Sequence, residues 1–233
     1  MRARSTMSPM SERKRWWIVV LFGVAMAWME SATVAYLRML VDRVNPYQAI
    51  PLPPHQALGN AELVREIATL VMLFVVGWLA GRDWRTRLAY SLIAFGVWDI
   101  FYYVFLAVIV GWPTSVFDWD VLFLIPLPWW GPVLAPAIIA LLMVVGGTIV
   151  TQFGQQLWPR RHALWIGAVG IALALIVFME TAIRALPGGE SALRHALPTR
   201  FNWPWFALAC ALMAVVIADL LHQKTRGLRG AKH

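Results

Sequence analysis

Four carboxylates lie inside long apolar stretches of the sequence, where acidic side chains are unusual: Glu30, Asp99, Glu180 and Asp219. A charge at the centre of a membrane-spanning helix costs about 2.5–3.5 kcal/mol on insertion scales, so its presence suggests a functional site. At a rise of about 1.5 Å per residue, Asp99 falls near mid-depth of its stretch and Glu30 in the outer half of its own. A buried carboxyl group that stays protonated can donate or accept a proton. Glu30 and Asp99 are therefore the candidate catalytic residues.

Five further residues bring charge or a hydroxyl group to the same outer half and are candidate ligand-binding residues: Arg38, Glu66, Tyr103, Asp118 and Asp120. Tyr103 lies one helical turn after Asp99, so its phenol can hydrogen-bond that carboxyl group. Arg38 is about 12 Å along the helix from Glu30 and about 80° around it, so the two side chains need a third partner. In such a site carboxylates can act as acid and base, while an arginine holds an anionic headgroup.

A structural role is the competing interpretation of these acids. A buried carboxylate that bonds an arginine, a tyrosine or a backbone group fixes the packing of two helices without any chemistry. Side chains near the ends of spans also reach water, so charges there need no functional explanation. We expect this structural role for three pairs: Glu180 with Arg184, Asp219 with His222, and Arg65 with Glu66.

Residues that bind metals or cofactors form no recognisable set in the sequence. The five histidines are scattered over loops and chain ends, with no pair four residues apart on a span, which gives haem or di-iron binding no support. Cys210 is the only cysteine, which excludes an intrachain disulfide and a thiolate metal cage. We interpret it as a small packing residue. The sequence predicts no metal site, and it identifies no cofactor.

The elements that position the candidate residues are predicted to be membrane-spanning helices. Of 233 residues, 60% are hydrophobic and 14% are charged, which is too apolar for a soluble globular domain. The backbone in lipid must bond within its own segment, and the apolar stretches lack the alternation of barrel strands. We predict one all-α transmembrane domain over residues 1–233, a bundle of about six helices. Its spans cover about 16–40, 63–81, 88–111, 133–153, 163–186 and 203–221.

The distribution of basic residues predicts the orientation of the spans. Fourteen of the twenty Lys and Arg residues lie on the side that carries both chain ends, and six lie on the other side. The richer side faces the cytoplasm, so both termini are predicted to be cytoplasmic in a bacterial inner membrane. The first span stays apolar well beyond the length of a secretory signal, which favours an uncleaved anchor. We interpret the net charge of +8 as a topology signal, with the lipid bilayer and not nucleic acid as the partner.

The loop between the third and fourth spans contains an apolar run that is too short to cross the membrane. Asp118-Trp119-Asp120 leads into this run, and prolines then interrupt helical continuity before the fourth span begins. We expect a segment at about 117–130 to lie in the membrane interface or to re-enter the bilayer. Such a segment is allowed only where protein covers its backbone.

Several groups of residues resemble those of a family of bacterial membrane proteins. They are Glu30 with Tyr36-Leu37-Arg38, residues 65–70 (REIATL), residues 95–103 (FGVWDIFYY), and Gly111-Trp112-Pro113 followed by Asp118-Trp119-Asp120 and residues 128–132 (PWWGP). The resemblance covers roughly the first four spans. The family consists of uncharacterised inner-membrane proteins with about six spans and no known function. The resemblance therefore implies a fold and a location, but no activity.

Three functions are consistent with the sequence. The leading one is the binding or modification of a lipid-like or other small molecule at a polar site in the outer half of the bundle. The second is proton- or cation-coupled transport, with Asp99 or Glu30 as the coupling carboxylate. The third is a non-catalytic subunit of a membrane complex, or a self-associating protein, which uses contacts such as the GxxxG pattern of residues 77–81. Whether the protein is an enzyme is left open.

Overall fold

The computed structural model describes residues 10–48, 56–124, 126–153 and 157–230. Within these ranges, six helices are long and apolar enough to cross a membrane, and each coincides with one predicted stretch. The predicted all-α bundle of about six spans is confirmed. The helices are α1 (Glu12–Leu40), α2 (Gln56–Ala80), α3 (Trp84–Val110), α4 (Leu134–Gln152), α5 (Arg161–Ala185) and α7 (Trp203–Gly230). Shorter elements connect them: strands β1 (Trp119–Phe123) and β2 (Trp129–Pro132), the 3-10 helix η1 (Leu186–Gly188) and helix α6 (Gly189–His195).

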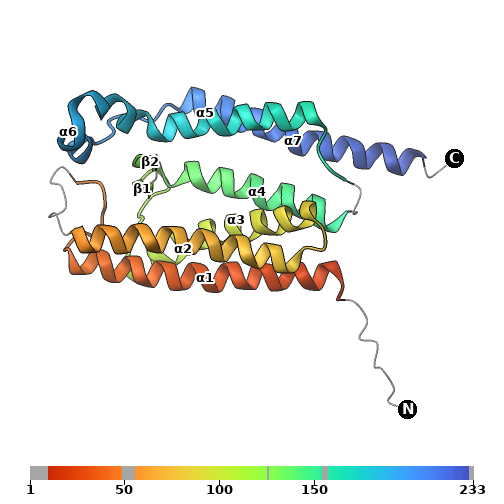
Figure 1. Ribbon diagram of the computed structural model, residues 1–233, viewed down its shortest axis with the longest axis horizontal. Helices are drawn as coiled ribbons and strands as arrows, with labels where there is room; N and C mark the ends of the chain where they lie inside the picture. The colour runs from red at the N-terminus through yellow and green to blue at the C-terminus, as the bar shows by residue number, and fades with distance from the viewer. Residues whose placement is uncertain (1–9, 49–55, 125, 154–156, 231–233) are drawn as a thin grey trace, which may run out of the picture.

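Helix α3 lies at the centre of one group of helices (Figure 1). It packs against α1, α2 and α4, whereas α1 and α2 touch each other only slightly. Beyond α4, helix α5 pairs with α7, and α7 also contacts α4. The start of α1 and the end of α7 lie at one end of the bundle, which we call the terminal end. The strands and α6 lie at the opposite end, which we call the hairpin end.

Local sequence determines where α3 begins and ends. The carboxylate of Asp83 accepts hydrogen bonds from the backbone N–H groups of Arg85 and Thr86, and the Thr86 hydroxyl accepts one from the Asp83 N–H. This capping box satisfies donors that the first turn of a helix leaves free. At the other end, Gly111 adopts a left-handed conformation with φ of 71° and its N–H bonds the carbonyl of Ala107. These two caps fix where α3 begins and ends, and therefore the depth of each of its side chains in the bundle.

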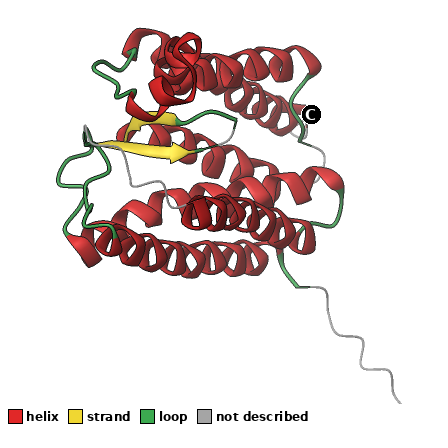
Figure 2. Cartoon of the chain, turned by 60° about the vertical axis from the view of Figure 1, so that its left-hand side comes forward, coloured by secondary structure: helices red, strands yellow, loops and turns green. Residues whose placement is uncertain are grey.

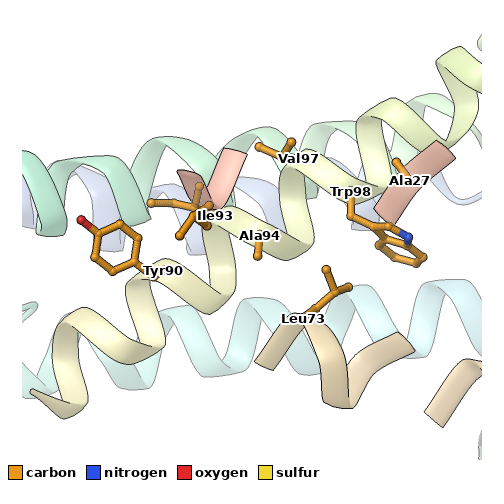
Figure 3. Packing of buried hydrophobic residues seen from close by; sticks show 8 residues of the cluster. Ala27, Leu73, Tyr90, Ile93, Ala94, Val97 and Trp98 are labelled. Carbon is orange, nitrogen blue, oxygen red and sulfur yellow. The ribbon is translucent and has the colours of Figure 1, made fainter. Parts of the chain in front are cut away.

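The core between α1, α2 and α3 is apolar and closely packed (Figure 3). Lipid is as apolar as these side chains, so van der Waals contact, and not the exclusion of water, holds them together. The cluster makes α3 a fixed support for the polar residues nearer the hairpin end. Its members in the figure include Ala27 of α1, Leu73 of α2, and Tyr90, Ile93, Ala94, Val97 and Trp98 of α3.

Helix α2 approaches α3 closely at Gly77, the first glycine of the GxxxG pattern. A Cβ atom placed on Gly77 would lie 2.3 Å from the backbone nitrogen of Ser91 and 2.2 Å from its hydroxyl oxygen. The same hydroxyl donates a hydrogen bond to the carbonyl oxygen of Phe74 at 3.1 Å, which ties the two helices together. The glycine pattern therefore marks an interface between two helices of the same chain.

Gly77→Ala is expected to destabilise the protein by about 1–3 kcal/mol, because the added methyl group overlaps the backbone of α3. The matched control is Gly146→Ala in α4, where a Cβ atom would lie 3.7 Å from its neighbour Ile217. That substitution is expected to be neutral or stabilising, since alanine is the better helix former. Thermal unfolding in detergent, followed by circular dichroism, compares the two variants. Equal unfolding temperatures would contradict the close approach.

A two-stranded antiparallel hairpin occupies the connection between α3 and α4 (Figure 2). Figure 2 shows it between the two groups of helices, and β2 contacts both α4 and α5. The strands satisfy each other's backbone groups, which non-helical backbone near a membrane requires. The paired residues are Trp119 with Pro132, Asp120 with Gly131, Val121 with Trp130 and Phe123 with Trp129. The segment predicted at about 117–130 is thus a hairpin. The sequence predicted no strands here, because the two runs of five and four residues show too little alternation to indicate them.

Candidate functional site

An ion pair between Arg38 and Asp120 fastens the hairpin to the end of α1. Arg38 Nη2 lies 2.8 Å from Asp120 Oδ1, and Arg38 Nη1 donates to the carbonyl oxygen of Val44 at 3.2 Å. The guanidinium carbon lies 4.3 Å from the centre of the Trp112 ring, within the range of a cation–π contact. Asp120 is 1% exposed, so the ion pair is formed away from water. Such a pair holds its two elements in one geometry, because either charge alone is costly.

A second ion pair joins α1 to α2. The guanidinium of Arg65 pairs with both Glu30 and Glu62, and the Thr69 hydroxyl donates a hydrogen bond to Glu30 Oε2 at 3.0 Å. The sequence paired Arg65 with Glu66; the charges of these two residues do act on each other, but the ion pairs of Arg65 are with Glu30 and Glu62. Neighbouring residues on a helix point in different directions, whereas residues three apart, such as Glu62 and Arg65, share a face.

Glu66 connects α2 to the hairpin. Its Oε2 atom accepts a hydrogen bond from the backbone N–H of Leu124 at 3.3 Å, and Leu124 directly follows β1. Glu66 is 9% exposed, so this carboxylate is also largely withdrawn from solvent. The hairpin is therefore held at one end by Arg38 of α1 and at the other by Glu66 of α2.

Asp99 lies well inside the bundle. It precedes Val110, the last residue of α3, by eleven positions, or about 16 Å of helix. It is 8% exposed, and its buried Oδ2 atom has no hydrogen-bond partner in the described part of the chain. The charges of Asp99 and Asp120 both act on Tyr103 and on each other. The Tyr103 hydroxyl, which the sequence assigned to Asp99, hydrogen-bonds Asp120 instead.

The two ion pairs and Asp99 belong to one electrostatic unit. The charge of Arg38 acts on Glu62, and the side chains of both ion pairs act on Tyr102. The exposed fraction of the side chain falls from 27% at Glu62 to 8% at Glu30, so side chains deeper in the bundle have less contact with solvent. We name it the hairpin-end cluster and define it as Glu30, Arg38, Glu62, Arg65, Glu66, Asp99, Tyr103 and Asp120.

The ionisation of Asp120 depends on its partners. Burial raises the pKa of Asp120 above its ordinary value, while Arg38, the Val121 N–H and the Tyr103 hydroxyl act in the opposite direction. A carboxyl group in an apolar setting keeps its charge only when such partners compensate for lost hydration. Arg38 is the partner that most strongly favours the ionised form of Asp120.

The structure brings six of the seven predicted site residues together: Glu30, Arg38, Glu66, Asp99, Tyr103 and Asp120. Asp118 is not part of the cluster. Its carboxylate accepts hydrogen bonds from the N–H groups of Thr114 and Ser115 and from the Thr114 hydroxyl, at 2.7, 3.1 and 2.9 Å. These local bonds close the turn that precedes β1, a common role for aspartate. Asp118 is thus a loop residue.

Sequence reasoning did not include Arg65 and Glu62 in the site. Their spacing contained the signal, because Glu62 precedes Arg65 by three residues and Glu66 by four, and Arg65 precedes Thr69 by four. Such spacing places polar side chains on one helical face. A polar face on an otherwise apolar span turns toward other protein elements and not toward lipid.

The other predicted pairs lie outside the cluster. Glu180 and Arg184 form the predicted ion pair on α5, with the arginine side chain 78% exposed. Asp219 was predicted to bond His222, and this was wrong. Its Oδ2 atom accepts the backbone N–H of Arg160 and the amide of Gln223, both at 2.9 Å. The backbone N–H at the start of α5 has no partner within its own helix, so it is a better-placed donor to Asp219 than the His222 side chain.

A separate polar group closes the terminal end of the bundle. The Tyr90 hydroxyl donates to Glu12 Oε2 at 2.9 Å, and Arg82 forms an ion pair with Glu12 at 3.2 Å. Arg15 donates to the carbonyl oxygen of Ala80 at 2.7 Å, which joins α1 to the end of α2. These bonds link the first helix to the turn between α2 and α3.

The chain was also compared with known proteins. Comparison with protein-family models, with curated proteins and with solved structures finds no match. Among the described residues, no group of three or more His, Cys, Asp or Glu residues could hold a metal ion. The chemistry of the hairpin-end cluster is accordingly inferred from its own geometry.

Proposed function

We propose that the protein lies in a bacterial inner membrane with both termini in the cytoplasm. Its six apolar helices suit a bilayer, and the excess of Lys and Arg residues at the terminal end supports this orientation. The hairpin end then faces the periplasm. In this orientation the hairpin-end cluster occupies the outer half of the membrane.

We propose that the hairpin-end cluster binds a lipid-like or other small molecule. The observation that carries this proposal is the surplus of acid in the cluster. Its members include five carboxylates but two guanidiniums, and all of them lie at one end of the bundle. Two of the carboxylates, Glu66 and Asp99, are outside both ion pairs although both are largely buried.

A purely structural role explains the ion pairs better than it explains the surplus. One acid and one base suffice to fix two helices, and apolar side chains of similar volume often do so at lower cost. Glu66 at least accepts the Leu124 N–H, whereas Asp99 adds a desolvation cost while its Oδ2 atom has no partner among the described residues. Ionisable residues retained at such depth in a membrane protein usually mark a binding site or a pathway.

A second function, proton- or cation-coupled transport, is supported by Asp99 in particular. This carboxyl group lies about 16 Å of helix from the hairpin end of α3, and its Oδ2 atom has no partner among the described residues. A carboxyl group at such a depth can take up and release a proton during a transport cycle. Flux into proteoliposomes that requires a pH gradient and disappears in Asp99→Asn would favour transport over binding alone.

Glu30→Gln and Asp99→Asn are each expected to reduce, by about tenfold, a compound that copurifies with the protein. The reason is the loss of one charged contact, and a tenfold change in affinity corresponds to about 1.4 kcal/mol. The protein is purified in a mild detergent, extracted with organic solvent and analysed by mass spectrometry against bulk membrane lipid. Gel filtration and circular dichroism establish that each variant is folded.

The control for this experiment is Glu180→Gln, which removes an acid of similar helical position outside the cluster. It should retain the copurifying compound at the wild-type level. The proposal fails if folded Glu30→Gln and Asp99→Asn carry the same compounds as the wild type. It also fails if the wild type carries only the bulk lipid mixture.

A further inference from the structure

We infer that the molecule bound by the hairpin-end cluster carries an ammonium group and that Asp99 is the counter-ion of this group. The inference rests on the proposed function and adds the chemical class of the ligand. It reverses the expectation from the sequence that an arginine of the site holds an anionic headgroup. Three features of the cluster lead to it: the occupied arginines, the free oxygen of Asp99 and the aromatic surroundings.

Both arginines of the cluster already have anionic partners. Arg38 is bound by Asp120, by the Val44 carbonyl and by the face of Trp112. Arg65 is bound by Glu30 and Glu62 together. An anionic ligand would have to displace these carboxylates and leave them unpaired away from water, which is unfavourable. The arginines therefore position the acids and do not present a free positive charge.

Asp99 offers the complementary group. It is more than nine-tenths buried, and its Oδ2 atom is unpartnered among the described side chains and backbone groups. Its interaction with Asp120 and Tyr103 places it on the side of α3 that faces the cluster. Two neighbouring carboxylates repel each other, so Asp99 beside Asp120 either takes up a proton or, when ionised, needs a cation as its partner.

The surroundings of Asp99 favour an organic cation over a metal ion. The rings of Tyr102 and Tyr103 lie 5.0 Å apart, and the ring of Trp112 follows at 6.5 Å from Tyr103. Aromatic faces attract ammonium and guanidinium groups, and Arg38 already makes this contact with Trp112. A metal ion needs several ligands, and no suitable group of three occurs in the described part of the chain.

An ammonium group of this kind can come from a lipid headgroup or from a soluble amine. The lipid probes are phosphatidylethanolamine, its N-acetylated form, which has lost the positive charge, and phosphatidylglycerol, all with the same acyl chains. The soluble probe is ethanolamine. Binding to the full-length protein in nonionic detergent is measured by native mass spectrometry for the lipids and by the shift in unfolding temperature for ethanolamine.

The wild-type protein should bind phosphatidylethanolamine about tenfold more tightly than the N-acetylated lipid. Asp99→Asn should abolish this preference, and Glu180→Gln should keep it. Binding of ethanolamine that depends on Asp99 identifies a soluble amine as sufficient, whereas binding of the lipid alone identifies a headgroup. Both results support an ammonium ligand. The comparison of the two lipids on the wild-type protein needs no variant, so it remains informative if Asp99→Asn does not fold.

Three results would overturn the inference: preference for phosphatidylglycerol, equal binding of the amine and its N-acetylated form, or a preference that survives Asp99→Asn. The last would mean that Asp99 is simply protonated, since asparagine closely resembles a protonated aspartate. The proposed function is decided separately by the copurification experiment. A copurifying anionic compound that depends on Glu30 would sustain the function and refute the ammonium class.

Discussion

Asp120→Asn is expected to lower the free energy of unfolding by about 3 kcal/mol, since breaking a buried ion pair leaves one charge without compensation. The substitution preserves the shape of the side chain and removes only its charge. Arg38 then remains in a largely buried position with a neutral partner, and a guanidinium cannot release its proton. The measurement is chemical or thermal unfolding of the purified protein in detergent at neutral pH.

The reverse substitution, Arg38→Gln, should cost less than Asp120→Asn. Asp120 would lose its counter-ion, but burial already raises the pKa of this carboxyl group, so it can take up a proton. The control is Glu180→Gln, where the partner Arg184 is exposed and the expected change is below about 0.5 kcal/mol. Equal losses for Arg38→Gln and Asp120→Asn would show that Asp120 does not take up a proton when Arg38 is removed.

Arg65→Met is expected to be the second strongly destabilising change, by about 3–5 kcal/mol at neutral pH. Arg65 serves two carboxylates, Glu30 and Glu62, so its removal leaves both without their cation. Unlike the loss in Asp120→Asn, this loss should shrink as the pH falls. Protonation removes the charge of a carboxylate, whereas the charge left behind in Asp120→Asn belongs to an arginine.

The control for Arg65→Met is Arg184→Met, which removes the exposed partner of Glu180 and should change stability by less than about 0.5 kcal/mol. Unfolding is measured for both variants and the wild type at several pH values between neutral and mildly acidic. A loss in Arg65→Met that does not depend on pH would argue that packing of the long side chain, and not its charge, stabilises α1 against α2.

The two ion pairs and the unpaired acid have different roles in this interpretation. Arg38 and Arg65 each bind acids from other parts of the chain and so fix the hairpin and α2 around α1. Asp99, on the well-packed α3, is held in place by the helix itself, and its Oδ2 atom has no hydrogen-bond partner among the residues that the structure describes. A rigid support with one unpaired charge is the arrangement that ligand binding requires, because the site is formed before the ligand arrives.

The helices were predictable because each one follows from the length and apolar character of its own segment. Six apolar stretches of sufficient length suffice to predict six spans, since lipid allows the backbone few other solutions. The two ends of α3 also depend on neighbouring residues alone, because Asp83 caps its start and Gly111 caps its end. The pair Glu180–Arg184 was predictable for the same reason, as both residues belong to one face of one helix.

The partners of the cluster were not predictable in the same way. Arg38 and Asp120 are 82 positions apart in the chain, and nothing in the spacing of either residue points to the other. The hairpin that carries Asp120 is too short to show a periodic pattern, and its register decides that Asp120 is buried while Asp118 serves the preceding turn.

Composition and hydropathy along the chain thus establish a six-helix membrane bundle and show which acids lie too deep to be incidental. Local patterns suffice for this because the bilayer imposes its demands on each segment separately. The choice of partner for each acid, and the isolation of Asp99, follow from the packing of α1, α2, α3 and the hairpin. Ion pairs between elements depend on distances that only the folded chain creates, so no single segment contains them.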